Sequence, residues 1–128
     1  MAEITPVLTP AAPAPGGHYS QAVVHNGVAY LAGQLPVIPG SPGAKPEGIE
    51  AQTLQVLRNI DAVLQACHSS RNRILRTTIY VSDITLWGKV NAVYAEFFGS
   101  HKPARTVVPV PALHYGYLVE MDAIAAVD

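Results

Sequence analysis

The sequence contains a single cysteine, Cys67, among its 128 residues. One thiol excludes an intramolecular disulfide and any zinc site that a chain builds from several cysteines. The five histidines do not supply a metal site either, because no two of them have a ligand spacing such as His-x-x-x-His. We therefore expect no metal site.

Long hydrophobic runs are also missing, although 49% of the residues are hydrophobic. No apolar stretch approaches the roughly 20 residues that a membrane-spanning helix needs. The first four residues, Met-Ala-Glu-Ile, show no basic segment followed by an apolar one, so no signal peptide is evident. We expect a cytoplasmic protein with no membrane association.

Charge is scarce. Charged residues make up 13% of the chain, against about 25% in ordinary soluble domains, and the net charge is -1. Arg71, Arg73 and Arg76 are the nearest thing to a basic cluster, which is too small for a nucleic-acid-binding stripe. A sparsely charged monomer remains an alternative, but so few charges favour an oligomer that hides surface between subunits.

Proline and glycine divide the chain. They crowd residues 1–15, an extended N-terminal lead-in with at most a short strand near Ile4, and residues 36–48, which we interpret as a surface loop. Between these segments, residues 23–31 contain two short, mostly apolar runs on either side of Asn26-Gly27. Asn-Gly is the strongest short signal for a β-hairpin, because both central residues of the turn need positive φ.

The rest of the chain alternates helix and strand patterns. Apolar residues recur at three- and four-residue steps over 49–67 and again over 86–98, where Asp83 is a candidate N-cap. Runs of β-branched and other apolar residues predict strands at 74–81, 105–110 and 118–127. Pro109 and Pro111, in or just after the strand at 105–110, indicate either an edge strand or the end of a strand.

The predicted order, β-β-α-β-α-β-β, indicates one α+β domain spanning residues 1–128. The hairpin favours an antiparallel or mixed β-sheet with both helices on one face. Such a sheet leaves its other face open, and several of these faces packed together would explain the scarcity of charge.

Two charged residues lie in apolar strand sequence. Arg105 begins Arg-Thr-Val-Val, and Glu120 lies within Leu-Val-Glu-Met. An arginine fork matches a carboxylate with two parallel hydrogen bonds, and a glutamate can hold and deprotonate water. The pair would suit hydrolysis of a small carboxylic acid. Spacing alone favours the structural alternative, in which the two residues form an ion pair or both point to solvent.

Other candidates are weaker. Cys67 precedes His68, but it falls on the apolar stripe of its helix, so core packing is favoured over a thiol nucleophile. Gly16-Gly17 and Gly33 do not form a nucleotide-binding motif. These glycines either allow tight turns or let the backbone approach a small ligand. In the second case, Tyr19 would supply a phenol to the ligand site.

Several motifs, in the expected order from about residue 16 to near the C-terminus, resemble those of the Rid (YjgF) family. They are His18-Tyr19-Ser20-Gln21-Ala22, Ala32-Gly33-Gln34-Leu35-Pro36, Gln52-Thr53 with Leu57-Arg58-Asn59-Ile60, Asn91 with Tyr94 and Phe97-Phe98, Pro103-Ala104-Arg105-Thr106, and Val119-Glu120-Met121-Asp122-Ala123-Ile124-Ala125.

The resemblance implies a fold like that of bacillary-type chorismate mutase and a homotrimer with clefts between subunits. It implies hydrolysis of reactive 2-imino or enamine acids to 2-keto acids and ammonia, a reaction that needs no metal or cofactor. Some family members are described as ribonucleases, but the missing basic stripe speaks against a nucleic-acid partner here. Arg105 would hold the substrate carboxylate and Glu120 would position the attacking water, which favours function over the structural alternative. The substrate-binding set implied is Tyr19, Ala32, Gly33, Asn91, Val107 and Tyr117.

The chain departs from the family pattern at several of these positions. Ala32 stands where many active members have serine, and Val107 where cysteine is frequent. The turn at residues 114–117, His-Tyr-Gly-Tyr, is aromatic where the best-known members have a polar turn led by proline. A larger or aromatic acid is therefore an alternative substrate. The remaining alternatives are an aminomuconate-like hydrolase and a non-catalytic binder of small carboxylic acids.

Overall fold

The computed structural model describes residues 2–128; Met1, part of the domain expected over residues 1–128, lies outside them. The chain forms one mixed α+β unit, as predicted, with the short strand near Ile4 present. The elements are β1 (Thr5–Val7), β2 (Ala22–His25), β3 (Val28–Gln34), α1 (Gly48–Ala66), β4 (Ile74–Val81), α2 (Trp87–Phe98), β5 (Ala104–Pro109) and β6 (Val119–Ala126), with short 3₁₀ turns at Arg71–Arg73, Ile84–Leu86 and His114–Gly116.

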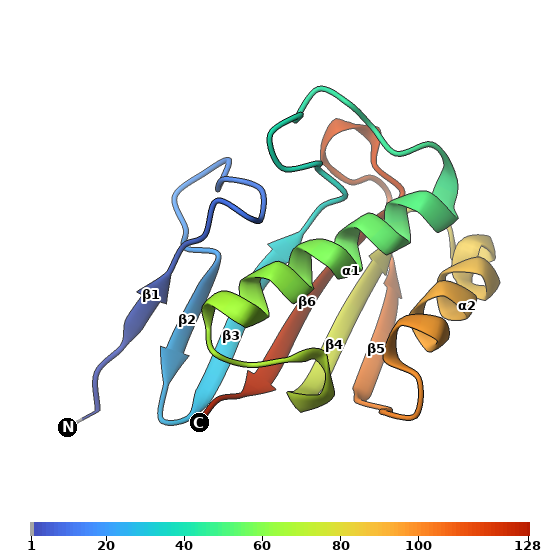
Figure 1. Ribbon diagram of the computed structural model, residues 1–128. Helices are drawn as coiled ribbons and strands as arrows, with labels where there is room; N and C mark the ends of the chain where they lie inside the picture. Colours follow the sequence, from blue (N-terminus) through green and yellow to red (C-terminus); the bar gives the residue numbers. More distant parts are fainter. Residues whose placement is uncertain (1) are drawn as a thin grey trace.

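One six-stranded sheet forms the base of the fold, in the order β1-β2-β3-β6-β4-β5 (Figure 1). Neighbouring strands are antiparallel except for β4 and β5, so the sheet is mixed. Asn26 and Gly27 have φ of 50° and 75°, which confirms the predicted hairpin turn between β2 and β3. β5 is an edge strand that ends at Pro109, as expected of a residue with no N–H for a further ladder bond.

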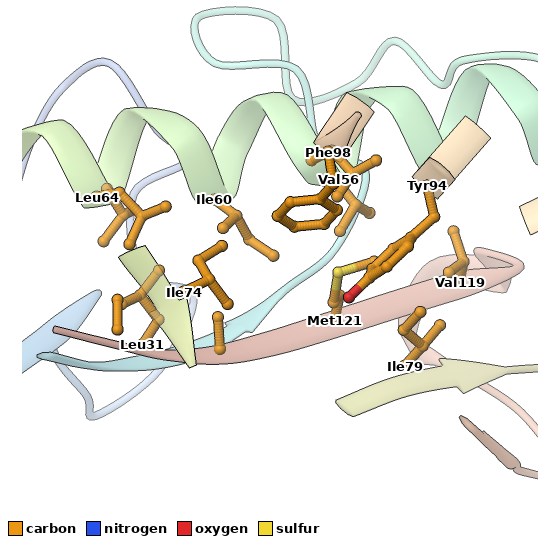
Figure 2. Close-up of a cluster of buried hydrophobic side chains, with 14 of the residues drawn as sticks. Leu31, Val56, Ile60, Leu64, Ile74, Ile79, Tyr94, Phe98, Val119 and Met121 are labelled. Atoms are coloured by element: carbon orange, nitrogen blue, oxygen red, sulfur yellow. The ribbon is translucent and has the colours of Figure 1, made fainter. Parts of the chain in front are cut away.

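Both helices pack on the same face of the sheet, where the core lies (Figure 1). In β6, buried residues alternate with partly exposed ones along the whole strand, which is the pattern of a sheet covered on one side. Met121 and Val119 of β6 meet Ile60 of α1 and Phe98 of α2 in this core (Figure 2). Cys67 is buried in the same cluster, which confirms the core-packing interpretation, and burial raises the pKa of its thiol.

Over the described part of the chain, residues 2–128, no helix lies on the other face of the sheet (Figure 1). Tyr30 of β3 is 49% exposed there, and the Tyr80 hydroxyl donates to Asp122 Oδ2 at 3.3 Å. Within residues 2–128, no helix is long and apolar enough to cross a membrane.

The start of α2 differs from the prediction. Asp83 accepts a hydrogen bond from the Thr85 backbone N–H at 2.9 Å, but this caps the 3₁₀ turn Ile84–Leu86, and the α-helix begins only at Trp87. The Thr85 hydrogen bonds hold the pKa of the Asp83 carboxyl below its usual value. An aspartate N-cap is compatible with either kind of helix, so the sequence predicted the cap and not the helix type.

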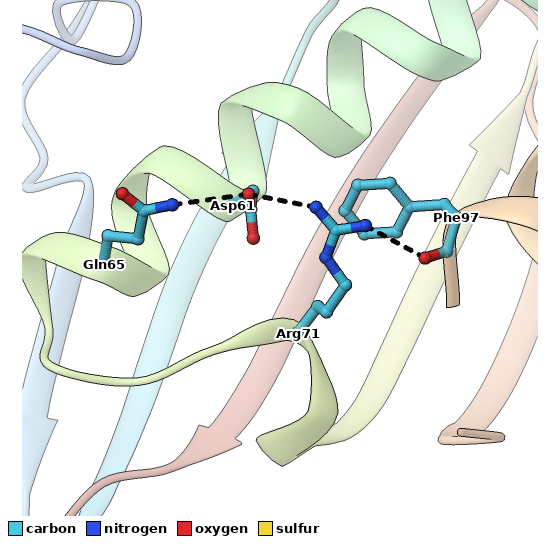
Figure 3. A network of polar contacts seen from close by, with 4 residues as sticks. All are labelled: Asp61, Gln65, Arg71 and Phe97. Carbon is cyan, nitrogen blue, oxygen red and sulfur yellow. Dashed lines mark hydrogen bonds and ion pairs between the residues drawn. The ribbon is translucent and has the colours of Figure 1, made fainter. Parts of the chain in front are cut away.

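Arg71 fixes the position of α2 relative to α1 (Figure 3). Its guanidinium pairs with Asp61 Oδ2 of α1 at 3.3 Å and donates to the Phe97 carbonyl of α2 at 3.0 Å. It also lies 3.8 Å from the centroid of the Phe97 ring. A cation at the C-terminal end of α2 complements the helix dipole, so this contact stabilises the end of the helix whose first two turns carry site residues.

Candidate functional site

The cavity of interest opens at the end of the sheet where β3 finishes and β6 begins, and it has a volume of about 1060 Å³. Three irregular segments surround it: residues 13–19, residues 35–45 and residues 114–117. Five of the residues predicted for the site line this cavity together: Tyr19, Ala32, Gly33, Tyr117 and Glu120.

Glu120 is the only carboxylate among the residues of 2–128 that line this cavity. Burial raises the pKa of its carboxyl above the ordinary glutamate value, nearby Asp122 raises it further, and His114 on the cavity wall lowers it. A carboxylate with a raised pKa exchanges protons more readily near neutral pH. The environment of Glu120 therefore suits a general base.

Gly33 faces this carboxylate directly. A Cβ atom at Gly33 would lie 2.5 Å from Oε2 of Glu120, closer than any real contact, so a side chain there would displace the carboxylate. The lack of a side chain at Gly33 thus leaves the space that the Glu120 carboxylate occupies.

A second group of predicted residues lies around β5 and α2. Arg105 Nη1 donates to Asn91 Oδ1 at 3.0 Å. The guanidinium also lies over the rings of Trp87 and Tyr94, at 4.5 Å and 4.8 Å from their centroids. The Tyr94 hydroxyl is in turn hydrogen-bonded to the Thr77 hydroxyl at 2.8 Å. Contacts with two rings and with the Asn91 amide limit the movement of the guanidinium, which prepares it to bind an anion.

Val107 belongs to this second group, because side chains two residues apart on a strand share a face. It packs against the hydrophobic core, next to Arg105 along β5. The predicted site residues therefore divide into two sets, one around the cavity and one around Arg105.

Arg105 and Glu120 point to opposite faces of the sheet. Arg105 pairs with Thr77 of β4, and Glu120 pairs with Tyr80 of the same strand. Residues paired across a ladder share a face, whereas Thr77 and Tyr80 are three residues apart and lie on opposite faces. The ion pairs among residues 2–128 join Arg71 to Asp61 and Arg73 to Asp128. An ion pair between Arg105 and Glu120 within one chain, which is one form of the structural alternative, is therefore wrong.

Three buried side-chain amides hold the segments around the cavity in place through hydrogen bonds to the backbone. Gln21 donates to the carbonyls of Thr9 and Pro13, at 3.1 Å and 2.8 Å, and holds the N-terminal segment. Asn59 donates to two carbonyls of the following loop, those of Leu35 at 3.0 Å and Val37 at 2.8 Å.

The third amide, Gln52, contacts the residues that directly follow the loop 35–45 and the turn 114–117. It donates to the Pro46 carbonyl at 3.2 Å and accepts from the Leu118 N–H at 2.9 Å. Gln52 and Asn59 both lie on α1, so one helix fixes the loop and the turn that form most of the cavity wall.

We expect Asn59→Ala to lower the free energy of unfolding by about 2 kcal/mol, since two partly buried carbonyls lose their donor. Urea unfolding followed by circular dichroism measures this. Gln65→Ala, which removes an exposed amide from the same helix, is the matched control and should change stability by less than about 0.5 kcal/mol. An equal loss of stability in the two variants would contradict the role of Asn59 in holding the loop.

Sequence reasoning missed two residues. Trp87 lies four residues before Asn91 and seven before Tyr94, so helical spacing could have placed it on the face that meets Arg105. Lys45 lines the cavity, but a lone lysine within a loop rich in proline and glycine gives no pattern to detect. Among residues 2–128, no group of three or more His, Cys, Asp or Glu side chains could hold a metal ion.

Comparison with known proteins identifies the family. The model of the family described as Endoribonuclease L-PSP matches residues 9–127. "RutC family protein PH0854" of Pyrococcus horikoshii is 42% identical over 119 residues, which cover 93% of this chain and 94% of the relative. "Reactive Intermediate Deaminase A, chloroplastic" of Arabidopsis thaliana is 37% identical over 93% of this chain and 64% of its own length.

Solved structures agree. A protein of the conserved Rid family, YyfA from Yersinia pestis, superposes with a TM-score of 0.94 at 41% identity, covering 98% of this chain and 100% of the other. E. coli TdcF with bound serine gives a TM-score of 0.92 at 29% identity, covering 97% and 99%. The chain therefore belongs to the endoribonuclease L-PSP family, which is also called the Rid or YjgF family.

Proposed function

We propose that this protein hydrolyses reactive 2-imino and enamine acids to 2-keto acids and ammonia, at sites shared between the subunits of a homotrimer. The observation that carries the proposal is the division of the site: the cavity holds Glu120, and the stacked Arg105 faces the other side of the sheet. A small substrate can reach both groups only if a second copy of the chain brings its own Arg105 to the cavity.

The proposed assembly packs the uncovered sheet faces together, in the manner of bacillary-type chorismate mutase. It would bury Tyr30 and its neighbours, which are exposed in the single chain. It also accounts for a charged fraction of only 13%, because surface that lies between subunits needs few charges.

The chemistry follows from the two groups. Arg105, held by Asn91 and two aromatic rings, receives the substrate carboxylate in a bidentate contact and so fixes the imine carbon beside Glu120. Glu120 takes a proton from water as the water oxygen bonds to the carbon of the imine, which is protonated on nitrogen, and this gives a neutral carbinolamine. Glu120 then returns the proton to the amino nitrogen. The C–N bond breaks as Glu120 takes up the proton of the carbinolamine hydroxyl, so ammonia leaves and the carbonyl forms.

The remaining residues of the proposed site shape it. Tyr19, Ala32, Gly33 and Tyr117 line the cavity beside Glu120, and Val107 lies beside Arg105. The names of the relatives support the reaction class: one is called a reactive intermediate deaminase, and another was solved with an amino acid, serine, bound. Because the net charge is -1, we do not extend the proposal to RNA cleavage despite the family's description.

The test is release of ammonia and keto acid from freshly generated 2-iminopropanoate and 2-iminobutanoate. We expect acceleration over the spontaneous rate by the wild type and loss of roughly 100-fold or more in kcat/KM for Arg105→Ala, which lacks the carboxylate anchor. Lys89→Ala, an exposed cation removed from α2, is the matched control. A folded protein that accelerates neither substrate would overturn the proposal.

A further inference from the structure

The turn at residues 114–117 carries an aromatic side chain that contributes nothing to the core. Tyr115 is 67% exposed, and its φ is +61°, in the left-handed region. A bulky residue in that region is strained, by an amount on the order of 1 kcal/mol. Neither the exposure nor the backbone conformation helps the chain to fold, so the turn needs another explanation.

The neighbouring rings form a cluster on the cavity wall. The Tyr115 ring centroid lies 5.9 Å from that of His114 and 6.3 Å from that of Tyr117, the latter in an edge-to-face arrangement. All three side chains belong to residues that line the cavity of Glu120. The strained backbone therefore presents aromatic surface to the same space that contains the general base.

Lys45 holds this turn in place from the opposite loop. Its ammonium donates a hydrogen bond to the Tyr115 carbonyl and lies 5.1 Å from the centroid of the Tyr117 ring. Since Lys45 is already engaged by a carbonyl and a ring, it braces the aromatic turn and is poorly placed to serve as a second anchor for an anion.

We propose that the turn of His114, Tyr115 and Tyr117, braced by Lys45, is a side-chain pocket that selects 2-imino acids carrying an aromatic ring. The substrate class rests on the proposed imine hydrolysis. The preference for an aromatic side chain rests on the turn itself. A ring that enters the cavity beside Glu120 stacks edge or face against Tyr115 and removes apolar surface of both partners from water. A cavity of about 1060 Å³ has room for a phenyl group in addition to the reacting atoms.

The experiment compares 2-imino-3-phenylpropanoate with 2-iminopropanoate in the wild type, in Tyr115→Asn and in Tyr115→Phe. Asparagine tolerates the left-handed backbone but lacks the ring, and phenylalanine keeps the ring. We expect the ratio of kcat/KM for the phenyl substrate over the methyl substrate to fall about tenfold in Tyr115→Asn, the value of one aromatic contact. The ratio should stay within about twofold in Tyr115→Phe. An unchanged ratio in a folded Tyr115→Asn variant would overturn the pocket.

A second measurement tests the aromatic pocket independently of imine hydrolysis. Isothermal titration of the same three proteins with 3-phenylpropanoate and with propanoate measures selection for a ring without any turnover. Tighter binding of 3-phenylpropanoate that is lost in Tyr115→Asn supports the pocket even if no imine is hydrolysed. Equal binding of the two acids by the wild type, or no binding of either, overturns it even if imines are hydrolysed.

Discussion

Trimers that combine Arg105→Ala and Glu120→Gln subunits should hydrolyse imines, although each variant alone should have lost at least about 99% of the wild-type activity. Arg105 and Glu120 of one chain face opposite sides of the sheet. In the proposed trimer, each site would therefore take its arginine from one subunit and its glutamate from the next. An Arg105→Ala subunit still offers an intact Glu120 cavity. A Glu120→Gln subunit still offers an intact arginine.

The symmetry of the trimer determines how much activity a mixed trimer recovers. In a cyclic trimer of either mixed composition, one of the three junctions joins an intact Arg105 to an intact Glu120, so activity should reach about one third of the wild-type value. Co-expression with two affinity tags and purification on both would isolate these mixed trimers, and kcat with 2-iminopropanoate would be measured.

The pure variants, carrying the same tags, are the controls. If Arg105 and Glu120 of one chain served the same substrate molecule, no mixed trimer would contain a complete site. Activity that stays at the level of the pure variants would therefore refute the shared site. A recovery clearly different from about one third would refute the threefold arrangement and leave the sharing intact.

The fold was largely predictable because its signals are local. Asn26-Gly27 marks its turn by the backbone conformation that the two residues accept. The apolar period of three and four residues marks α1. The failure at the start of α2 has the same origin: a cap at Asp83 is a local signal, but whether a 3₁₀ turn or an α-helix follows depends on packing.

The site was only half predictable. Sequence patterns selected Arg105 and Glu120 as charges in apolar strands, but the face on which each lies depends on how β4 pairs with β5 and with β6. A slip of one residue in either ladder would exchange the faces, so spacing along the chain could not separate an ion pair from a divided site. Lys45 could not be found at all, since its role arises from a contact across 70 residues of sequence.

Glu120→Gln should lower kcat/KM for 2-iminopropanoate by roughly 100- to 10,000-fold, the range that a general base contributes. Glutamine fills the same space in the cavity but cannot accept a proton from water at neutral pH. Because Arg105 is untouched, binding of propanoate measured by calorimetry should stay within a few fold of the wild type. Loss of that binding would mean that Glu120 shapes the site, and retained turnover would mean that another group activates the water.

The pH dependence provides an independent check on the same carboxylate. Burial raises the pKa of Glu120, and as a base it works only when deprotonated, so kcat/KM should fall as the pH drops through that raised pKa. The positive charge of His114 lowers the pKa of Glu120, so His114→Gln should move this acidic limb to higher pH. Comparing the variant with the wild type after subtracting spontaneous hydrolysis removes the effect of imine protonation, which is common to both. A limb that shifts to lower pH, or does not move, would assign the titration to a group other than Glu120.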